Sequence, residues 1–149
     1  MPRSRLSSDE GSASLEFITA GMILLVPIVY LVLVMSAVQS AALAVEGASR
    51  QGARVFVQGD DASSASRSAE RAIRFALADY GVDADAATIS ISCEPDPRDC
   101  LARHAYVTVT ISASVPLPLV PTAISVDQPI AITLESTATQ QVSRFRSTP

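Results

Sequence analysis

Charged and aromatic residues are both scarce in this chain of 149 residues. Charged residues make up 17% of the sequence, against roughly 25% in an average soluble protein. Aromatic residues make up only 5%, and tryptophan and lysine are absent. The apolar share of 48% is therefore mainly aliphatic. This composition excludes disorder driven by charge, and the net charge of -4 argues against a general binder of polyanions such as nucleic acid.

Cysteine, histidine and glycine are also few. Two cysteines exclude a disulfide-dense miniprotein. His104 is the only histidine, so a Ser-His-Asp or Cys-His site would have to be built around it, and the G-x-S-x-G motif is absent. The six glycines form no group that would cradle a phosphate. We therefore expect neither an enzyme nor a cofactor.

Charge is missing altogether between Glu16 and Glu46. Within this interval Phe17 to Val38 read FITAGMILLVPIVYLVLVMSAV, and only Thr19 and Ser36 are polar. The run supplies the roughly 20 helical residues that a hydrocarbon core about 30 Å thick requires. A core helix would have to hide an all-round apolar surface inside a small protein. The run is therefore predicted to be a transmembrane helix.

This segment has two alternative fates. Arg3 and Arg5 form a basic N-terminal region, and Ala42-Leu43-Ala44 resembles a signal-peptidase site, which would leave a mature chain starting near Val45. The apolar run is, however, longer than the roughly 7 to 15 residues of a signal core. It also contains Pro27, which should kink the helix and which membrane helices tolerate. We therefore expect the segment to stay as an anchor.

One carboxylate stands at the start of the apolar run. Glu16 follows Gly11-Ser12-Ala13-Ser14-Leu15 and directly precedes Phe17. An ionisable side chain in a membrane is costly, so Glu16 either stays among the headgroups near the helix N-terminus or finds a partner. Its position leaves both interpretations open.

A short polar leader, a glycine, and then Glu-Phe at the start of a long apolar helix resemble the class III signal of type IV pilin-like proteins. With the tail from Glu46 to Arg54 included, the segment Gly11 to Arg54 resembles the TadE-like family, minor pseudopilins of the tight-adherence (Flp, type IVb) pilus system. Many members carry their proline closer to the Glu than Pro27 is. The rest of the chain carries no motif of that family.

The resemblance implies that a prepilin peptidase cuts after Gly11 on the cytoplasmic side and leaves the helix in the membrane. Ser12 would become the mature N-terminus. Glu16, followed by Phe17, would then meet the N-terminal amine of a neighbouring subunit, which is mostly protonated at neutral pH. Residues 1-11 would be a cytoplasmic leader, 12-57 the transmembrane and extended helix, and 58-149 an extracytoplasmic domain.

The function implied by this resemblance is pilus assembly and adhesion by a single-pass protein of the cytoplasmic membrane. The implied partners are membrane lipid, the prepilin peptidase, other pilin or pseudopilin subunits and the assembly machinery, but no nucleic acid. The alternative is a secreted or membrane-tethered extracytoplasmic binding module that is released by, or anchored through, an ordinary signal sequence. The first residue of the mature chain would distinguish this alternative from a pseudopilin cut after Gly11.

Two helical segments are predicted outside the span. Ala41 to Val57 should continue the first helix, and its many small residues suit either close packing with other subunits or plain helix propensity. Glu46 and Arg50 are placed to pair at i,i+4. A second helix should start after Ser63 or Ser64 and stop at Gly81. Its predicted apolar stripe is Ala69, Ala72, Ile73, Ala76, Leu77 and Tyr80.

Alternating apolar residues then predict strands at Thr88 to Cys93, Tyr106 to Val115 and Pro129 to Glu135. The segment Thr137 to Val142 is left unassigned. A connection with Pro116, Pro118 and Pro121 precedes the third strand and does not suit a central strand. We predict the α+β class: a long transmembrane helix continuing into a small pilin-like domain, with one further helix packed on an antiparallel sheet of three or four strands.

Cys93 and Cys100 bracket a loop of turn-forming residues. On the extracytoplasmic side we expect a disulfide, while the alternative would use both thiolates with His104 as metal ligands at an unusual spacing. The acidic pairs Asp60-Asp61 and Asp83/Asp85 lack the glycine and distal glutamate of a calcium loop.

Three arginines of the second predicted helix, Arg67, Arg71 and Arg74, could be taken for a nucleic-acid patch. Glu70 is placed to pair with Arg74, and the chain is acidic as a whole. A solvated face is therefore the better interpretation.

Overall fold

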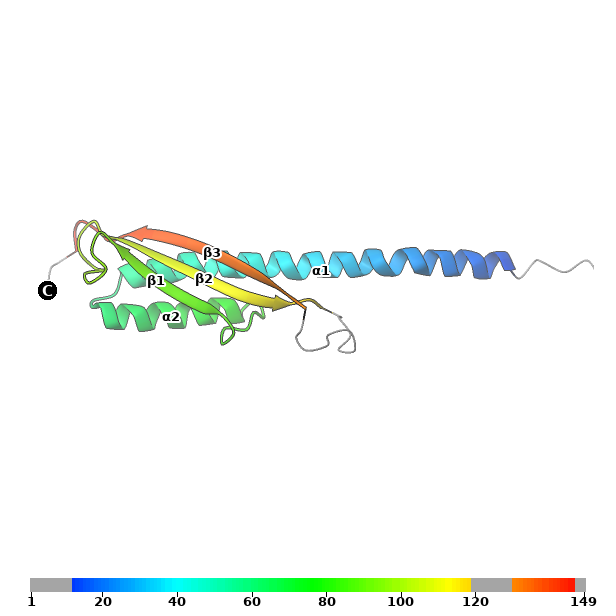
Figure 1. Ribbon diagram of the computed structural model, residues 1–149, viewed down its shortest axis with the longest axis horizontal. Coiled ribbons are helices and arrows are strands. Elements are labelled where there is room, and N and C mark those ends of the chain that lie inside the picture. Colours follow the sequence, from blue (N-terminus) through cyan, green and yellow to red (C-terminus); the bar gives the residue numbers. More distant parts are fainter. Residues whose placement is uncertain (1–11, 119–129, 147–149) are drawn as a thin grey trace, which may run out of the picture. The chain divides into compact units, whose positions relative to one another are not determined.

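The computed structural model describes residues 12-118 and 130-146 (Figure 1). The predicted leader, with Gly11, and Pro121 of the proline-rich connection lie outside the described residues. The elements are α1 (Ser12–Val57), α2 (Ala62–Ala78), β1 (Thr88–Glu94), β2 (Tyr106–Pro116) and β3 (Ala131–Gln141). The chain divides into two compact units, Met1–Met35 and Ser36–Pro149.

Helix α1 has 46 residues and contains Pro27. In the first unit its large apolar side chains other than the half-buried Val34 are exposed, from 37% for Tyr30 to 80% for Phe17. None of them is buried by the described part of the protein. The helix is long and apolar enough to cross a membrane, and it lies near the N-terminus. The chain is thus compatible with a single-pass membrane protein.

The second unit contains a three-stranded antiparallel sheet in the order β1-β2-β3. Val109 of the central strand β2 lies opposite Ile91 of β1 and Ala138 of β3. The three predicted strands are present, although Pro129, the predicted start of the third, lies outside the described residues. Strand β3 starts at Ala131 and runs on to Gln141, so it takes in most of the segment that the pattern left unassigned. Beyond Glu135 the inward positions of β3 are Ser136 and Ala138, which are small or polar. The apolar alternation therefore fades although the strand continues.

One face of the sheet forms the core. The inward side chains Val107, Val109, Ile111 and Ala113 of β2 are at most 1% exposed. The C-terminal part of α1 and helix α2 both supply side chains to the same core, and Figure 1 shows α2 and the strands alongside this part of α1. Their buried apolar residues are Ala41, Ala44, Val45, Ala48, Ala53, Phe56, Ala65, Ala69, Ile73 and Leu77.

The small residues of α1 have a packing role inside the unit. A Cβ added to Gly52 would lie 2.5 Å from Cδ1 of Ile73 and 3.6 Å from Cγ1 of Val109. Gly52 therefore lies where α1 packs closely against Ile73 of α2 and near Val109 of β2. Contact with other subunits is not needed to explain the buried alanines, because they pack within this unit.

The ends of α2 differ from the prediction. Asp61, not Ser63 or Ser64, is the N-cap, and its carboxylate accepts the amides of Ser63 at 3.0 Å and Ser64 at 2.9 Å. The serine hydroxyls also donate to this carboxylate. These bonds, that from the Ser64 amide first, hold the pKa of Asp61 well below its usual range.

The C-terminal end of α2 also differs from the prediction. The C-cap is Asp79, and Tyr80, which the apolar stripe placed inward, is 54% exposed because it lies beyond the helix. Gly81 has a φ of 70°, a left-handed conformation that glycine adopts without strain, and its amide donates to the Ala78 carbonyl at 2.9 Å. The helix thus ends at Ala78, before the predicted stop, and Gly81 lies in the turn that follows it.

Candidate functional site

The predicted processing and assembly residues lie at the start of α1. The helix begins at Ser12, and Gly11 lies outside the described residues. Glu16 is exposed, and in the part of the chain that the structure describes no cationic group lies within 4.0 Å of its carboxylate. Phe17 beside it is 80% exposed. Any partner of Glu16 would therefore come from outside these residues.

The alternative cleavage site is part of the folded unit. Ala42-Leu43-Ala44 lies within α1, and Ala44 and Val45 are each only 1% exposed. A protease needs an accessible, extended segment. A cut before Val45 would also remove Ala41 and Ala44 from the core. The geometry therefore disfavours a mature chain that begins at this position.

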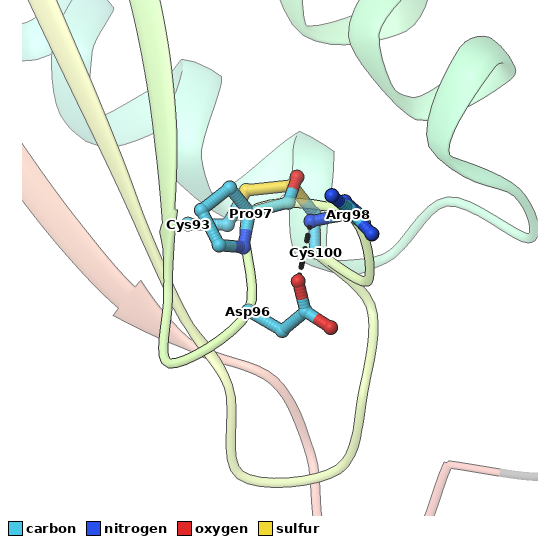
Figure 2. Close-up of a disulfide and its surroundings, with 5 residues drawn as sticks. All are labelled: Cys93, Asp96, Pro97, Arg98 and Cys100. Carbon is cyan, nitrogen blue, oxygen red and sulfur yellow. Dashed lines mark hydrogen bonds between the residues drawn. A yellow bond between two sulfur atoms is a disulfide. The ribbon is translucent and has the colours of Figure 1, made fainter.

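The two cysteines form a disulfide with a Cα–Cα distance of 5.1 Å (Figure 2). Cys93 lies near the end of β1, opposite Val107, and is 5% exposed. The bridge closes a loop in which the Asp96 carboxylate accepts the Arg98 amide at 2.9 Å. Because both sulfurs are bonded to each other, neither offers a thiolate to a metal.

The histidine and the acidic pairs form no metal site in the described ranges. His104 has a φ of 66°, and its amide donates to the Val142 carbonyl at 3.3 Å. Among residues 12-118 and 130-146, no three His, Cys, Asp or Glu side chains are grouped so that they could hold a metal ion.

The arginines of α2 differ in their pairing. Arg74 bonds to Glu70 at 3.2 Å and to Asp85 at 2.5 Å, and these two carboxylates, Asp85 first, raise its pKa. Arg71 donates to the Ser68 hydroxyl at 3.0 Å. In the described chain neither Arg67 nor Arg71 has a carboxylate within 4.0 Å. The outer face of α2 thus carries unpaired positive charge.

A third arginine arrangement was not foreseen from the sequence. The Arg146 guanidinium donates to the carbonyls of Gly59 at 2.5 Å and Asp60 at 2.7 Å, and more weakly to that of Val57 at 3.4 Å. Arg103 donates to the Arg146 carbonyl at 2.9 Å. Segments far apart in sequence are thereby tied to the end of α1. An isolated arginine near a chain end gives no sequence signal for such a contact.

A cavity of about 310 Å³ opens where the α1–α2 turn meets the disulfide loop. Its lining mixes Asp60, Asp61 and Asp99 with Arg98, Arg103 and Arg146. Carboxylates and guanidinium groups thus line the same cavity.

Comparison with protein-family models, with curated proteins and with solved structures finds no match for this chain. The TadE-like resemblance therefore stays an interpretation of the residues between Gly11 and Arg54.

Proposed function

We propose that the chain is a membrane-anchored, TadE-like minor pseudopilin that takes part in pilus assembly or adhesion. In this proposal a prepilin peptidase removes residues 1-11 after Gly11. The new N-terminus at Ser12 remains on the cytoplasmic side, and residues 58-149 form a pilin-like domain outside the cytoplasm. The protein acts through contacts with lipid and other pilin subunits and has no catalytic activity.

The observation that carries the proposal is the continuity of α1. This helix runs without a break from Ser12 to Val57, with exposed apolar side chains in its first unit and core residues in the second. A helix that anchors in lipid at one end and packs in a folded domain at the other suits a pilin-like subunit. The placement of Glu16 near its start suits a partner amine on another subunit.

Two further observations support the proposal over an ordinary secreted module. The alternative cut before Val45 would fall in a buried stretch of helix. In addition, the Cys93–Cys100 disulfide suits an oxidising compartment and thus an extracytoplasmic domain. Both features agree with an N-terminus that stays inside and a domain that lies outside.

Mass spectrometry of the mature protein, co-expressed with a prepilin peptidase, tests the processing step. We expect a chain that starts at Ser12. Gly11→Asp should block cleavage, because the scissile bond needs the small residue for close approach to the peptidase. Gly21→Ala is the matched control, since a Cβ there meets nothing within 4 Å. A start near Val45, or normal processing of the Gly11 variant, would refute the assignment.

The role of Glu16 is tested separately. Glu16→Ala should be cut normally, because the scissile bond is unchanged, but should co-purify poorly with other pilin subunits. Glu46→Ala alters an exposed carboxylate farther along the same helix and serves as the control. Unimpaired co-purification of the Glu16 variant would remove our account of this carboxylate.

A further inference from the structure

We propose that the acidic, disulfide-closed loop of one copy of this protein docks on the arginine face of α2 of another copy. The contact would join Glu94 and Asp99 to Arg67 and Arg71. It lies wholly in the unit Ser36–Pro149, so it goes beyond the proposed function and does not depend on processing at Gly11.

The loop is one half of this contact. Glu94, Asp96 and Asp99 are exposed there and outnumber the single cation Arg98. The disulfide and the bond from the Arg98 amide to Asp96 hold the loop in one shape. Figure 2 shows the Asp96 carboxylate turned toward that amide. A loop that is ordered before binding loses less conformational entropy when it docks.

The outer face of α2 is the other half. Arg67 and Arg71 are exposed and one helical turn apart, so their side chains lie on the same face. Phe75, one further turn along, is 71% exposed. Helix α2 carries three arginines and one glutamate, whereas the whole chain has a net charge of -4. It is thus a positive and partly apolar surface on an acidic protein.

A second copy fits because the charges complement one another and form no ion pairs among the described residues. Of the described carboxylates, only Glu46, Glu70 and Asp85 form ion pairs, so the loop acids are free as well. The loop and the helix face are different surfaces, so each copy offers one of each. Such a contact joins two different surfaces, so it can continue from one copy to the next and join more than two copies.

The test uses the full chain in a non-ionic detergent, studied by sedimentation velocity. The wild type should associate at about 0.02 M salt and dissociate at about 0.5 M, because the Debye length shortens with salt. Association through the apolar part of α1 would not show this salt dependence. Arg67→Glu/Arg71→Glu and, separately, Glu94→Arg/Asp99→Arg should each weaken association by about tenfold or more, since like charges then meet.

Mixing the two double variants is the decisive step. Each should be monomeric alone, whereas the mixture should associate, because each charge-reversed surface now meets an opposite one. Arg54→Glu/Arg144→Glu makes the same change in net charge as Arg67→Glu/Arg71→Glu, but at other positions, and should leave association intact. A wild type that is monomeric at low salt, an equal loss in the control, or a mixture that stays monomeric would overturn the proposal. Circular dichroism and thiol titration check that the variants keep their fold and disulfide.

Discussion

The hydroxyls of Ser49 and Ser136 lie 3.2 Å apart and join α1 to β3 inside the second unit. Ser49 is fully buried, and its hydroxyl also donates to the Glu46 carbonyl at 2.9 Å. A hydroxyl has one proton, so Ser49 accepts from Ser136 while it donates to Glu46. This polar contact fixes the position of the edge strand against a helix that otherwise presents alanines.

Ser49→Ala should therefore lower the stability of the fold. The change leaves the half-buried Ser136 hydroxyl without its partner, and the lost hydrogen bond costs about 0.5 to 1.5 kcal/mol. The better helix propensity of alanine offsets about 0.5 kcal/mol of this loss. Thermal unfolding followed by circular dichroism should show a lower melting temperature. Ser90→Ala, on the exposed face of β1, is the control, and an equal effect of both changes would contradict the role of the contact.

Two glycines of α1 allow substitutions that should change the stability of the folded unit in opposite directions. Gly52→Ala should destabilise the unit by about 1 to 3 kcal/mol, because the new Cβ overlaps Ile73, which is fully buried and cannot move aside. Gly47→Ala meets nothing within 4 Å. It should stabilise the helix by about 0.5 to 1 kcal/mol through propensity. Urea unfolding of both variants gives the signs, and the same sign for both would disprove the close approach at Gly52.

Much of this fold follows from local patterns in the sequence. The uncharged run identifies the first half of α1, and the alternation in β2 identifies its buried face, because Val107, Val109 and Ile111 repeat with the period of a strand. The pattern fails in β3 at Ser136, where the inward residue is a hydroxyl that bonds to Ser49. A contact between residues 87 positions apart is not visible in a local window.

The details of the candidate sites were less predictable. Asp61, Ser63 and Ser64 are all good N-cap residues, and the choice depends on which backbone turns first into the helix. For Cys93 and Cys100 the sequence favours a bridge over metal ligation, and the two residues form a disulfide in the structure. The role of Arg146 at the end of α1 depends entirely on tertiary structure.

The lowered pKa of Asp61 predicts a dependence of stability on pH. A carboxyl whose pKa is lower in the folded than in the unfolded chain stabilises the fold at pH values above its unfolded pKa of about 3.9. This contribution is lost as the pH falls through the folded pKa. The melting temperature of Asp61→Ala should thus be below that of the wild type at pH 7, and the gap should narrow below about pH 4. Asp60→Ala is the control, and a gap that widens in acid would contradict the cap.

Removal of the disulfide should destabilise the unit by about 2 to 3 kcal/mol, the chain-entropy value for so short a loop. Cys93→Ala/Cys100→Ala is the suitable variant, because serine would place a hydroxyl at the buried position of Cys93. Urea unfolding of the wild type with and without reductant should reproduce the difference, while the double variant should not respond to reductant. Two thiols labelled by iodoacetamide in the unreduced, denatured protein would contradict the bridge.

Arg146 should act as a clamp on the end of α1. The last carbonyl of α1 and those of the turn after it have no helical partners, and a guanidinium can donate to several of them at once. Arg146→Ala removes donors to the carbonyls of Val57, Gly59 and Asp60 and should cost about 1 to 3 kcal/mol. Limited proteolysis should then cut the segment from Ser143 to Arg146 faster than in the wild type.

Two further variants separate this clamp from a general effect of charge. Arg146→Lys keeps the charge but has no planar fork, so it should restore only part of the resistance to proteolysis. Arg144→Ala removes a neighbouring arginine whose guanidinium lies 4.5 Å from the centre of the Phe145 ring. Since Phe145 is 80% exposed, that contact holds no other element in place. Arg144→Ala should match the wild type, and faster cleavage in it than in Arg146→Ala would show that Arg146 does not hold the segment.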